Sequence, residues 1–271
     1  MKITATQKAA FDRDGFLILP SVSEAVSQNI EKWANEVKNL PSSPDAWMHY
    51  DEINSAGKQI LSRTENFASY HEGFNALFRG QEMLGILEAL MGEPVALLKE
   101  KINYKQAWAG GYSAHIDSVA YEHIAPVKHL SVLMAAEPST LENGCLEVVA
   151  GSHKAPIPMG KDRCIPSEWC EKHEWIPVPL ESGQFLIFSS YLAHRSGSNN
   201  SEKGRAAIYA TYNVLSDGGD KHEAYYEDRR KAWPPTSERI TGERYEEGAK
   251  IYGFGSPMLT VEKNGYKDIG L

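Results

Sequence analysis

The chain has 271 residues, 42% of them hydrophobic, and a formal net charge of −8 at pH 7. This length suits one all-β domain with extensions, because such domains reach roughly 200–250 residues. We therefore expect a single domain over residues 1–271. The acidic charge argues against a nucleic-acid partner, since a duplex binder needs a basic face.

The same sequence gives no reason to expect a membrane partner or a disulfide framework. It has no run of about 18 apolar residues, and its first residues lack the features of a secretory signal. Its three cysteines have no zinc-type spacing. We expect a cytoplasmic protein with reduced thiols, and we leave its oligomeric state open.

The first third of the chain has mostly helical patterns. Residues 5–13 and 22–38 show the apolar spacing of amphipathic helices, and a strand-like run at 15–20 separates them. Residues 45–66 are polar and irregular, which suits a loop covering a site. Residues 68–92 return to a helical pattern with apolar side chains at helical spacing.

From about residue 93 the chain shows short apolar runs separated by glycine and proline turns. These runs lie at 95–104, 129–136, 145–149, 183–188 and 206–212. Short strands in such a series are typical of a double-sheet jelly roll. We expect a mainly β, cupin-like fold with flanking helices, whose jelly-roll core (a double-stranded β-helix) spans about 93–215. A C-terminal extension follows, and residues 216–257 are predicted to be a solvated helix and tail.

A metal site is indicated by two histidines and one aspartate. His115 and Asp117 stand at i and i+2, so on a strand they point to the same side and can hold one ion. His194 lies 79 positions downstream (194 − 115) and can add a third ligand from a later strand. Two imidazoles and one carboxylate leave three positions open, as in non-haem Fe(II) oxygenases. We predict an iron site at these three residues.

Arg205 stands eleven positions after this last histidine (205 − 194). Its planar guanidinium can hold a carboxylate at two points, which a dicarboxylate cosubstrate requires. The alternative role for Arg205 is a surface ion pair with Glu202 or Glu181.

A second set of charged residues follows a strand period. Alternation places Lys99, Lys101 and Asn103 on one face of their strand. An inward face would favour an anionic substrate, because buried lysines are costly without an anion. A partly exposed sheet edge is the alternative, since lysine is common there.

Further motifs accompany these residues. They are Phe11–Phe16 (FDRDGF), Glu142–Leu146 (ENGCL) and Ala150–Lys154 (AGSHK). With the His-x-Asp pair, the distal histidine and the arginine, they resemble the phytanoyl-CoA dioxygenase family of Fe(II)/2-oxoglutarate oxygenases over most of the chain. Family members usually carry a proline where this chain has Ala150, a departure that does not touch the site.

The resemblance implies Fe(II), 2-oxoglutarate and O₂, with ascorbate as an optional stimulant. It implies that Arg205 and Ser196 bind the distal carboxylate of 2-oxoglutarate. It further implies that Asn103 contacts this cosubstrate and that Tyr112 walls its pocket. Retention of Asp117 implies hydroxylation, because halogenating relatives lose this carboxylate.

The resemblance leaves three substrate classes: acyl-CoA thioesters, small zwitterions such as ectoine, and small organophosphonates. The acidic charge and the lack of a long basic groove disfavour coenzyme A. The segments 48–52 and 61–67 resemble the covering segment of small-molecule members. We take 2-aminoethylphosphonate, hydroxylated at the carbon next to phosphorus, as the best single substrate. Candidate contacts to it are Lys101, Lys105, Tyr50, Glu65 and Asp51.

Two other kinds of protein stay open from the sequence. One is a jelly-roll binding protein without turnover, although such a protein has no need of Arg205 or Ser196. The other is a jelly-roll enzyme that is not an oxygenase. Those enzymes usually bind metal through a histidine-rich set with a glutamate, which this spacing does not offer.

Overall fold

Two sheets form the core of the computed structural model, which describes residues 1–53, 58–120, 123–124 and 129–254. The larger sheet has the strand order β1-β8-β5-β10-β4-β3-β2, and the smaller has the order β7-β6-β9. Neighbouring strands pair antiparallel throughout. The strands are β1 Phe16–Leu19, β2 Met48–Ile53, β3 Gln59–Glu65, β4 Val95–Lys105, β5 His129–Ala135, β6 Leu146–Val148, β7 Ile176–Val178, β8 Phe185–Ser189, β9 His194–Ser196 and β10 Arg205–Val214. This architecture confirms the predicted jelly roll with flanking helices.

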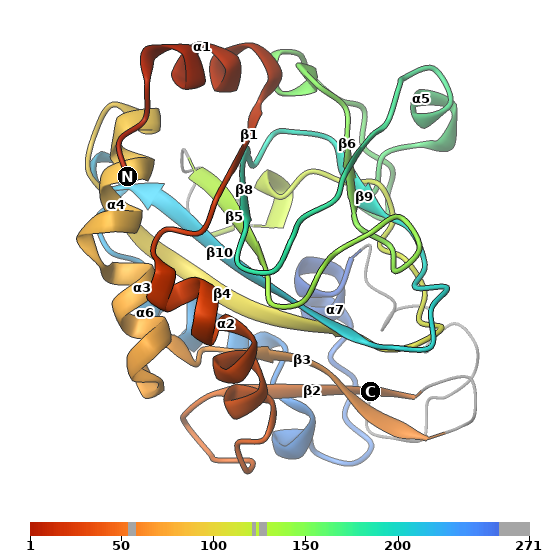
Figure 1. Cartoon of the computed structure of the whole chain (residues 1–271). Coiled ribbons are helices and arrows are strands. Elements are labelled where there is room, and N and C mark those ends of the chain that lie inside the picture. The colour runs from red at the N-terminus through yellow and green to blue at the C-terminus, as the bar shows by residue number, and fades with distance from the viewer. Residues whose placement is uncertain (54–57, 121–122, 125–128, 255–271) are drawn as a thin grey trace.

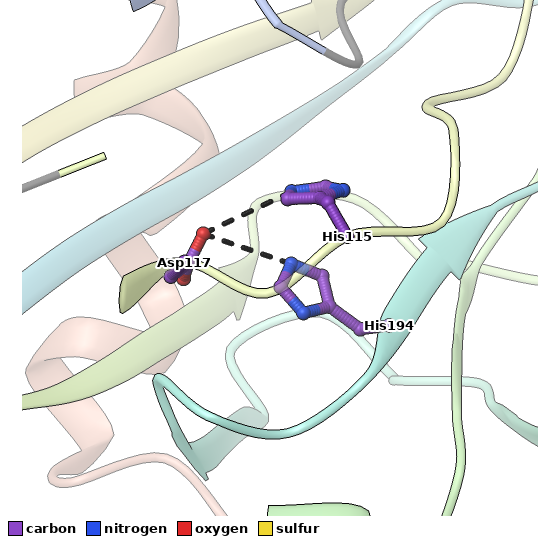
Figure 2. Close-up of side chains that lie close together, drawn as sticks. All are labelled: His115, Asp117 and His194. Atoms are coloured by element: carbon purple, nitrogen blue, oxygen red, sulfur yellow. Dashed lines mark ion pairs between the residues drawn. The ribbon is translucent and has the colours of Figure 1, made fainter. Parts of the chain in front are cut away.

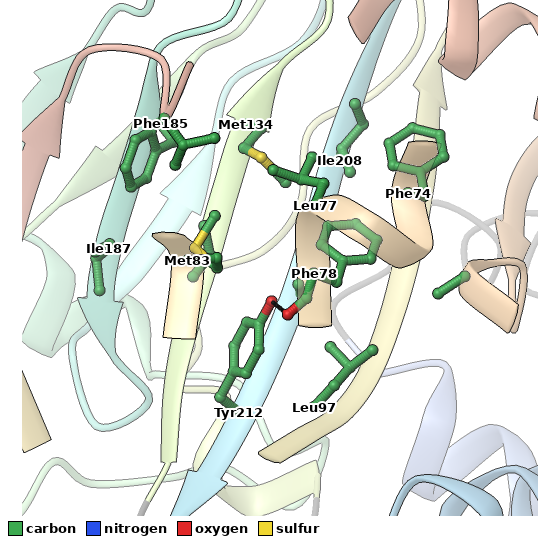
Figure 3. Packing of buried hydrophobic residues seen from close by; sticks show 14 of the residues in the cluster. Phe74, Leu77, Phe78, Met83, Leu97, Met134, Phe185, Ile187, Ile208 and Tyr212 are labelled. Carbon is green, nitrogen blue, oxygen red and sulfur yellow. Dashed lines mark hydrogen bonds between the residues drawn. The ribbon is translucent and has the colours of Figure 1, made fainter. Parts of the chain in front are cut away.

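Helices cover one face of the larger sheet (Figure 1). The helices are α1 Ala5–Asp14, α2 Glu24–Lys38, α3 Glu72–Arg79, α4 Gln81–Met91, α5 Ser167–Cys170, α6 His222–Ala232 and α7 Glu246–Tyr252. Phe74 and Phe78 of α3 stack on each other and pack toward Ile208 and Met134 of the sheet (Figure 3). The Tyr212 hydroxyl donates to the carbonyl oxygen of Phe78 at 2.9 Å. Among the described helices, none has the length and apolar character needed to cross a bilayer.

Alternation along β5 explains why the larger sheet is covered on both faces. Val132 and Met134 belong to the apolar cluster under the helices. Leu133 and Ala135 belong to the cluster shared with the smaller sheet. Because successive side chains point to opposite faces, one strand contributes to both layers. His115 and His194 converge beside the smaller sheet, where the two residues form an antiparallel bridge.

The structure corrects the loop predicted at 45–66. These residues form the hairpin strands β2 and β3, and β3 extends the larger sheet by pairing with β4. The connecting residues 54–57 lie outside the described part of the chain. The strand pattern is hidden in the sequence because inward positions such as Arg63 and Glu65 are charged, although both side chains are buried.

Two helical predictions also change. The expected helix at 68–92 is divided at Gly80, where a Cβ atom would lie 2.2 Å from the carbonyl oxygen of Ala76. The C-terminal stretch is not a solvated helix, because Tyr225, Tyr226 and Arg229 of α6 are buried. Tyr225 and Arg229 lie at i and i+4 on one side of the helix, and Tyr226 widens this side to a broad buried stripe, so α6 packs it against the body of the fold. Residues 255–257 of this prediction lie outside the described residues.

Candidate active site

His115, Asp117 and His194 come together between the sheets, with one donor atom from each lying within 4.8 Å of the others. The Nε2 atoms of His115 and His194 lie 3.9 and 3.7 Å from the Asp117 Oδ1 atom. Figure 2 shows the three side chains pointing toward one another. Paired backbone hydrogen bonds of 3.0 Å between His115 and His194 join the loop to the start of β9. These three residues could therefore hold one metal ion through two imidazoles and one carboxylate, the donor set of non-haem Fe(II) oxygenases.

Backbone carbonyls orient the two imidazole rings. The Nδ1 atom of His115 lies 2.7 Å from the carbonyl oxygen of Ser113, and that of His194 lies 2.9 Å from the carbonyl oxygen of Leu192. A carbonyl oxygen only accepts, so each Nδ1 carries the proton. The lone pair is then on Nε2, the atom nearest the aspartate. Hydrogen bonds of this kind are the usual support of a metal-binding histidine.

Local electrostatics also favour the ligand forms of these groups. Burial, together with the nearby His194, lowers the pKa of His115 to about 3. Burial acts to raise the pKa of Asp117, but His194, His115 and Lys101 outweigh it and hold that pKa well below its usual range. The Ser131 hydroxyl donates to Oδ2 of Asp117 and leaves Oδ1 toward the histidines. The site thus presents neutral imidazole and ionised carboxylate.

A second group of residues lies where β4 and β10 pair. Arg205 stands opposite Lys105 in the register, and both side chains are buried. The Lys105 Nζ atom donates to Ser196 Oγ at 3.0 Å and to the Gly144 carbonyl at 3.3 Å. Arg205 donates to the carbonyl oxygens of Asn143 (3.1 Å) and Gly144. Within the described residues, neither cation forms an ion pair with a carboxylate.

Two buried cations without an acidic partner suit an anionic ligand. Burial lowers the pKa of Lys105 to about 7, and the neighbouring Arg205 contributes to this. The ion pair of Arg205 with Glu181 or Glu202, considered from the sequence, is not among those of the described residues. Gly144 has φ +72°, and a Cβ atom there would lie 2.3 Å from the Gly197 carbonyl. Only glycine therefore lets this turn approach the two cations so closely.

Lys105, Arg205 and Ser196 are called the anion site below, and Asn103 and Tyr112 lie next to it. Asn103 is buried on β4, and its Oδ1 atom has no hydrogen-bond partner among the described residues. The backbone N–H of Tyr112 donates to Ser196 Oγ at 3.2 Å. Tyr112 also lines the cavity beside His115, so this residue contacts both groups of residues.

A cavity of about 40 Å³ adjoins the histidine–aspartate pair. Its lining includes the cations Arg63, Lys99, Lys101 and Arg229, the acids Glu65 and Asp117, and the aromatic residues Tyr112, Tyr225, Tyr252 and Phe254. Burial lowers the pKa of Lys99 to about 8 and drives that of Lys101 well below its usual value. Since β4 lies between β10 and β3, this lysine face is not a sheet edge. The cavity suits a small anion.

The structure separates the residues expected to contact substrate. Lys101 and Glu65 line the cavity, whereas Lys105 lies in the anion site with Arg205. Tyr50 is fully buried and its hydroxyl donates to the Trp233 carbonyl at 2.8 Å. The Asp51 carboxylate accepts from Gln59 at 2.6 Å. Neither Tyr50 nor Asp51 lines the cavity, because the hairpin turns these side chains elsewhere.

Sequence reasoning missed Arg63 and Arg229 as cavity residues. Arg63 lay in a stretch taken for a loop, and Arg229 in one taken for a solvated helix. The spacing of Tyr225 and Arg229 at i and i+4 was the available signal for a buried helical face. Charged residues on such a face are usually solvated, which concealed it.

A jelly roll that brings two histidines and one aspartate together, with two buried cations that lack a carboxylate partner nearby, defines an oxygenase of the Fe(II)/2-oxoglutarate class. The chain belongs to the phytanoyl-CoA dioxygenase family, whose model matches residues 11–207. It is therefore a dioxygenase that uses Fe(II) and 2-oxoglutarate and acts on a small molecule.

Two relatives match nearly the whole chain. The 2-aminoethylphosphonate dioxygenase of the uncultured bacterium HF130_AEPn_1 is 34% identical over 94% of this chain and 98% of its own length. The methylphosphonate hydroxylase of Gimesia maris is 37% identical over 98% of this chain and 96% of its own length. The crystal structure of EctD from S. alaskensis with 2-oxoglutarate and 5-hydroxyectoine shares the fold, with a TM-score of 0.66 at 22% identity. That comparison covers 79% of this chain and 77% of the other.

Proposed function

We propose that the protein hydroxylates a small organophosphonate at the carbon next to phosphorus. His115, Asp117 and His194 would hold the iron in this reaction. Two relatives named for phosphonate substrates, at 34% and 37% identity over nearly the full chain, support this substrate class. The observation that carries the proposal is the charge of the cavity beside the metal ligands.

Four cationic side chains and two carboxylates line that cavity. Asp117 belongs to the metal set, and Glu65 is ion-paired with Arg63 at 3.2 Å and with Arg229 at 2.8 Å. The excess of cationic side chains favours an anionic substrate, because a buried cation is most stable with an anion beside it. A phosphonate offers three oxygens and up to two negative charges to Lys101 and its neighbours. A bound phosphonate would also restore the charged form of Lys101, whose pKa is depressed by burial.

The remaining residues would bind and orient the cosubstrate. Arg205, Ser196 and Lys105 would hold the distal carboxylate of 2-oxoglutarate, and Asn103 and Tyr112 would line its path to the metal ligands. When bound, iron and 2-oxoglutarate supply the activation of O₂, so that one oxygen atom enters a C–H bond and the other enters succinate as CO₂ leaves. Tyr112, which contacts both groups of residues, would keep substrate and cosubstrate apart.

Two phosphonates are candidates within this class. 2-Aminoethylphosphonate is the first, and its ammonium group would lie against the rings of Tyr252 and Phe254, which line the cavity. Methylphosphonate is the second. It is favoured by one observation: the Glu65 carboxylate is already committed to two arginines. Asp117 is a predicted metal ligand. Among the lining residues that the structure describes, no further carboxylate is available to pair with the substrate's ammonium group.

The test is a succinate-release assay on the purified protein with Fe(II), 2-oxoglutarate and ascorbate. We expect succinate and a new phosphorus NMR signal with a phosphonate, and none with ectoine, the carboxylate β-alanine or an acyl-CoA. Succinate formed only with a compound from this second group would overturn the phosphonate assignment. A non-catalytic binding protein would give no succinate with any compound and no visible band on anaerobic addition of Fe(II) and 2-oxoglutarate.

A further inference from the structure

We infer that Arg229 is a substrate-binding residue, so that helix α6 completes the pocket with a guanidinium group that contacts the phosphonate, and that Glu65 is its positioning residue. This inference rests on the proposed function. It assigns a binding role to the C-terminal part of the chain, which lies beyond the family match at residues 11–207.

The hydrogen bonds of Arg229 leave one edge of its guanidinium open. Its Nε and Nη2 atoms donate to the two carboxylate oxygens of Glu65 at 2.9 and 2.8 Å. The Nη1 atom is buried and has no hydrogen-bond partner among the described residues. Because the guanidinium is planar, Nη1 is directed away from the carboxylate that holds the opposite edge. An unsatisfied buried donor is costly, and a ligand oxygen would satisfy it.

Aromatic rings fix the orientation of this open edge. The guanidinium carbon of Arg229 lies 4.7 Å from the centre of the Tyr50 ring and 4.5 Å from that of the Tyr252 ring. The side chain is only 1% exposed, and it lines the same cavity as His115 and Asp117. Its donor is thus preorganised, so little side-chain entropy is lost when an anion binds.

The neighbouring Arg63 shows the same incomplete pairing. It shares the Glu65 carboxylate with Arg229, and its Nε atom is buried without a partner among the described residues. One carboxylate therefore balances only one of two guanidinium groups. An ion pair with only a structural role would have equal numbers of positive and negative groups. It would not line a cavity beside the predicted metal ligands. With Lys101 on the same lining, the two arginines offer donors on several sides of a three-oxygen anion.

The experiment compares full-length Arg229→Lys, Arg229→Gln and Glu65→Gln with the wild type. We expect each Arg229 variant to raise the KM for the phosphonate roughly 30-fold, the effect of losing one charge-assisted hydrogen bond. The KM for 2-oxoglutarate and the anaerobic Fe(II)–2-oxoglutarate band should stay unchanged. Calorimetric titration of the metal-free protein with the phosphonate should show the same loss of affinity. Glu65→Gln should raise the KM less, since it only loosens the guanidinium.

Arg230→Gln is the matched control on the same helix. Arg230 pairs with Glu238 and donates to the Ala46 carbonyl, away from the cavity. It should leave the KM for the phosphonate unchanged. If Arg229→Gln does not fold, Arg229→Lys keeps the charge and carries the test. A wild type without phosphonate turnover would overturn the proposed function. Wild-type turnover together with an unaltered phosphonate KM and affinity in the folded Arg229 variants would overturn only this inference.

Discussion

Lys105 and Arg205 face each other across β4 and β10, and both donate a hydrogen bond to the carbonyl oxygen of Gly144. Two like charges held this close in a buried site repel each other, and the carbonyl dipoles of Asn143, Gly144 and Gly197 compensate them only in part. The pairing is therefore most stable when an anion lies between or beside them. This relationship supports the proposal that the two residues bind the distal carboxylate of 2-oxoglutarate.

Replacing Arg205 should weaken cosubstrate binding without affecting the metal. Arg205→Ala removes charge-assisted hydrogen bonds worth about 1.5–3 kcal/mol, so the KM for 2-oxoglutarate should rise roughly 10- to 150-fold. Steady-state succinate release measures this, and metal analysis should show unchanged iron content. Lys203→Ala, an exposed cation two positions away, is the control. An unaltered KM in Arg205→Ala would refute the role given to this residue.

Binding of 2-oxoglutarate should also depend on the protonation of Lys105. Its pKa of about 7 lies below the usual value of 10.5, because burial and the nearby Arg205 disfavour the charged form. The free enzyme therefore carries the charge below pH 7 and loses it as the pH rises. We expect the KM for 2-oxoglutarate to increase from about pH 6 to about pH 9.

The variant Lys105→Met tests this assignment. It should bind 2-oxoglutarate weakly at every pH and should lose the rise across this range, since the titrating ammonium is gone. Calorimetric titrations at several pH values measure both effects. A rise of the same size in Lys105→Met would assign the titration to another group.

The metal site should fail when one imidazole is removed. His194→Ala deletes one of three donor atoms that lie within 4.8 Å of one another, so iron binding and succinate formation should be lost while the fold persists. Metal analysis, circular dichroism and the anaerobic Fe(II)–2-oxoglutarate band measure these outcomes. Treatment of the wild type with a chelator should abolish turnover, and Fe(II) should restore it. His173→Ala is the control, because this histidine is exposed, and it should behave like the wild type. Full turnover in His194→Ala would contradict the ligand assignment.

Much of the fold was predictable because apolar side chains dominate its strands. The runs that became β5, β8 and β10 are apolar on both faces, as strands covered by helices on one side and a second sheet on the other must be. The β2–β3 hairpin was not predictable by the same signal. Its inward positions include Arg63 and Glu65, and a hydrophobicity pattern cannot show that two opposite charges are buried together.

The His115–Asp117 pair was predictable because its spacing is local, and His194 because it completes the family pattern, whereas the division of roles along β4 was not. Lys101 and Lys105 share a strand face, but four residues separate them by roughly 13 Å. That distance puts Lys101 at the cavity and Lys105 in the anion site. Arg229 was harder still, since it is placed by Glu65, a partner 164 positions away in the chain.

The helical layer should support stability without contributing directly to catalysis. Phe78 of α3 is fully buried, stacks on Phe74 with ring centroids 5.5 Å apart, and packs on the face of the larger sheet that is opposite the metal ligands. Phe78→Ala should lower the free energy of unfolding by about 3–5 kcal/mol, because it removes a large apolar side chain and leaves a cavity. Urea unfolding measures this loss. The exposed Tyr70→Ala should cost far less. The larger sheet separates Phe78 from the site. The variant that remains folded should therefore keep its KM for 2-oxoglutarate. A changed KM would mean that the helical layer positions Arg205 or Lys105 through the sheet.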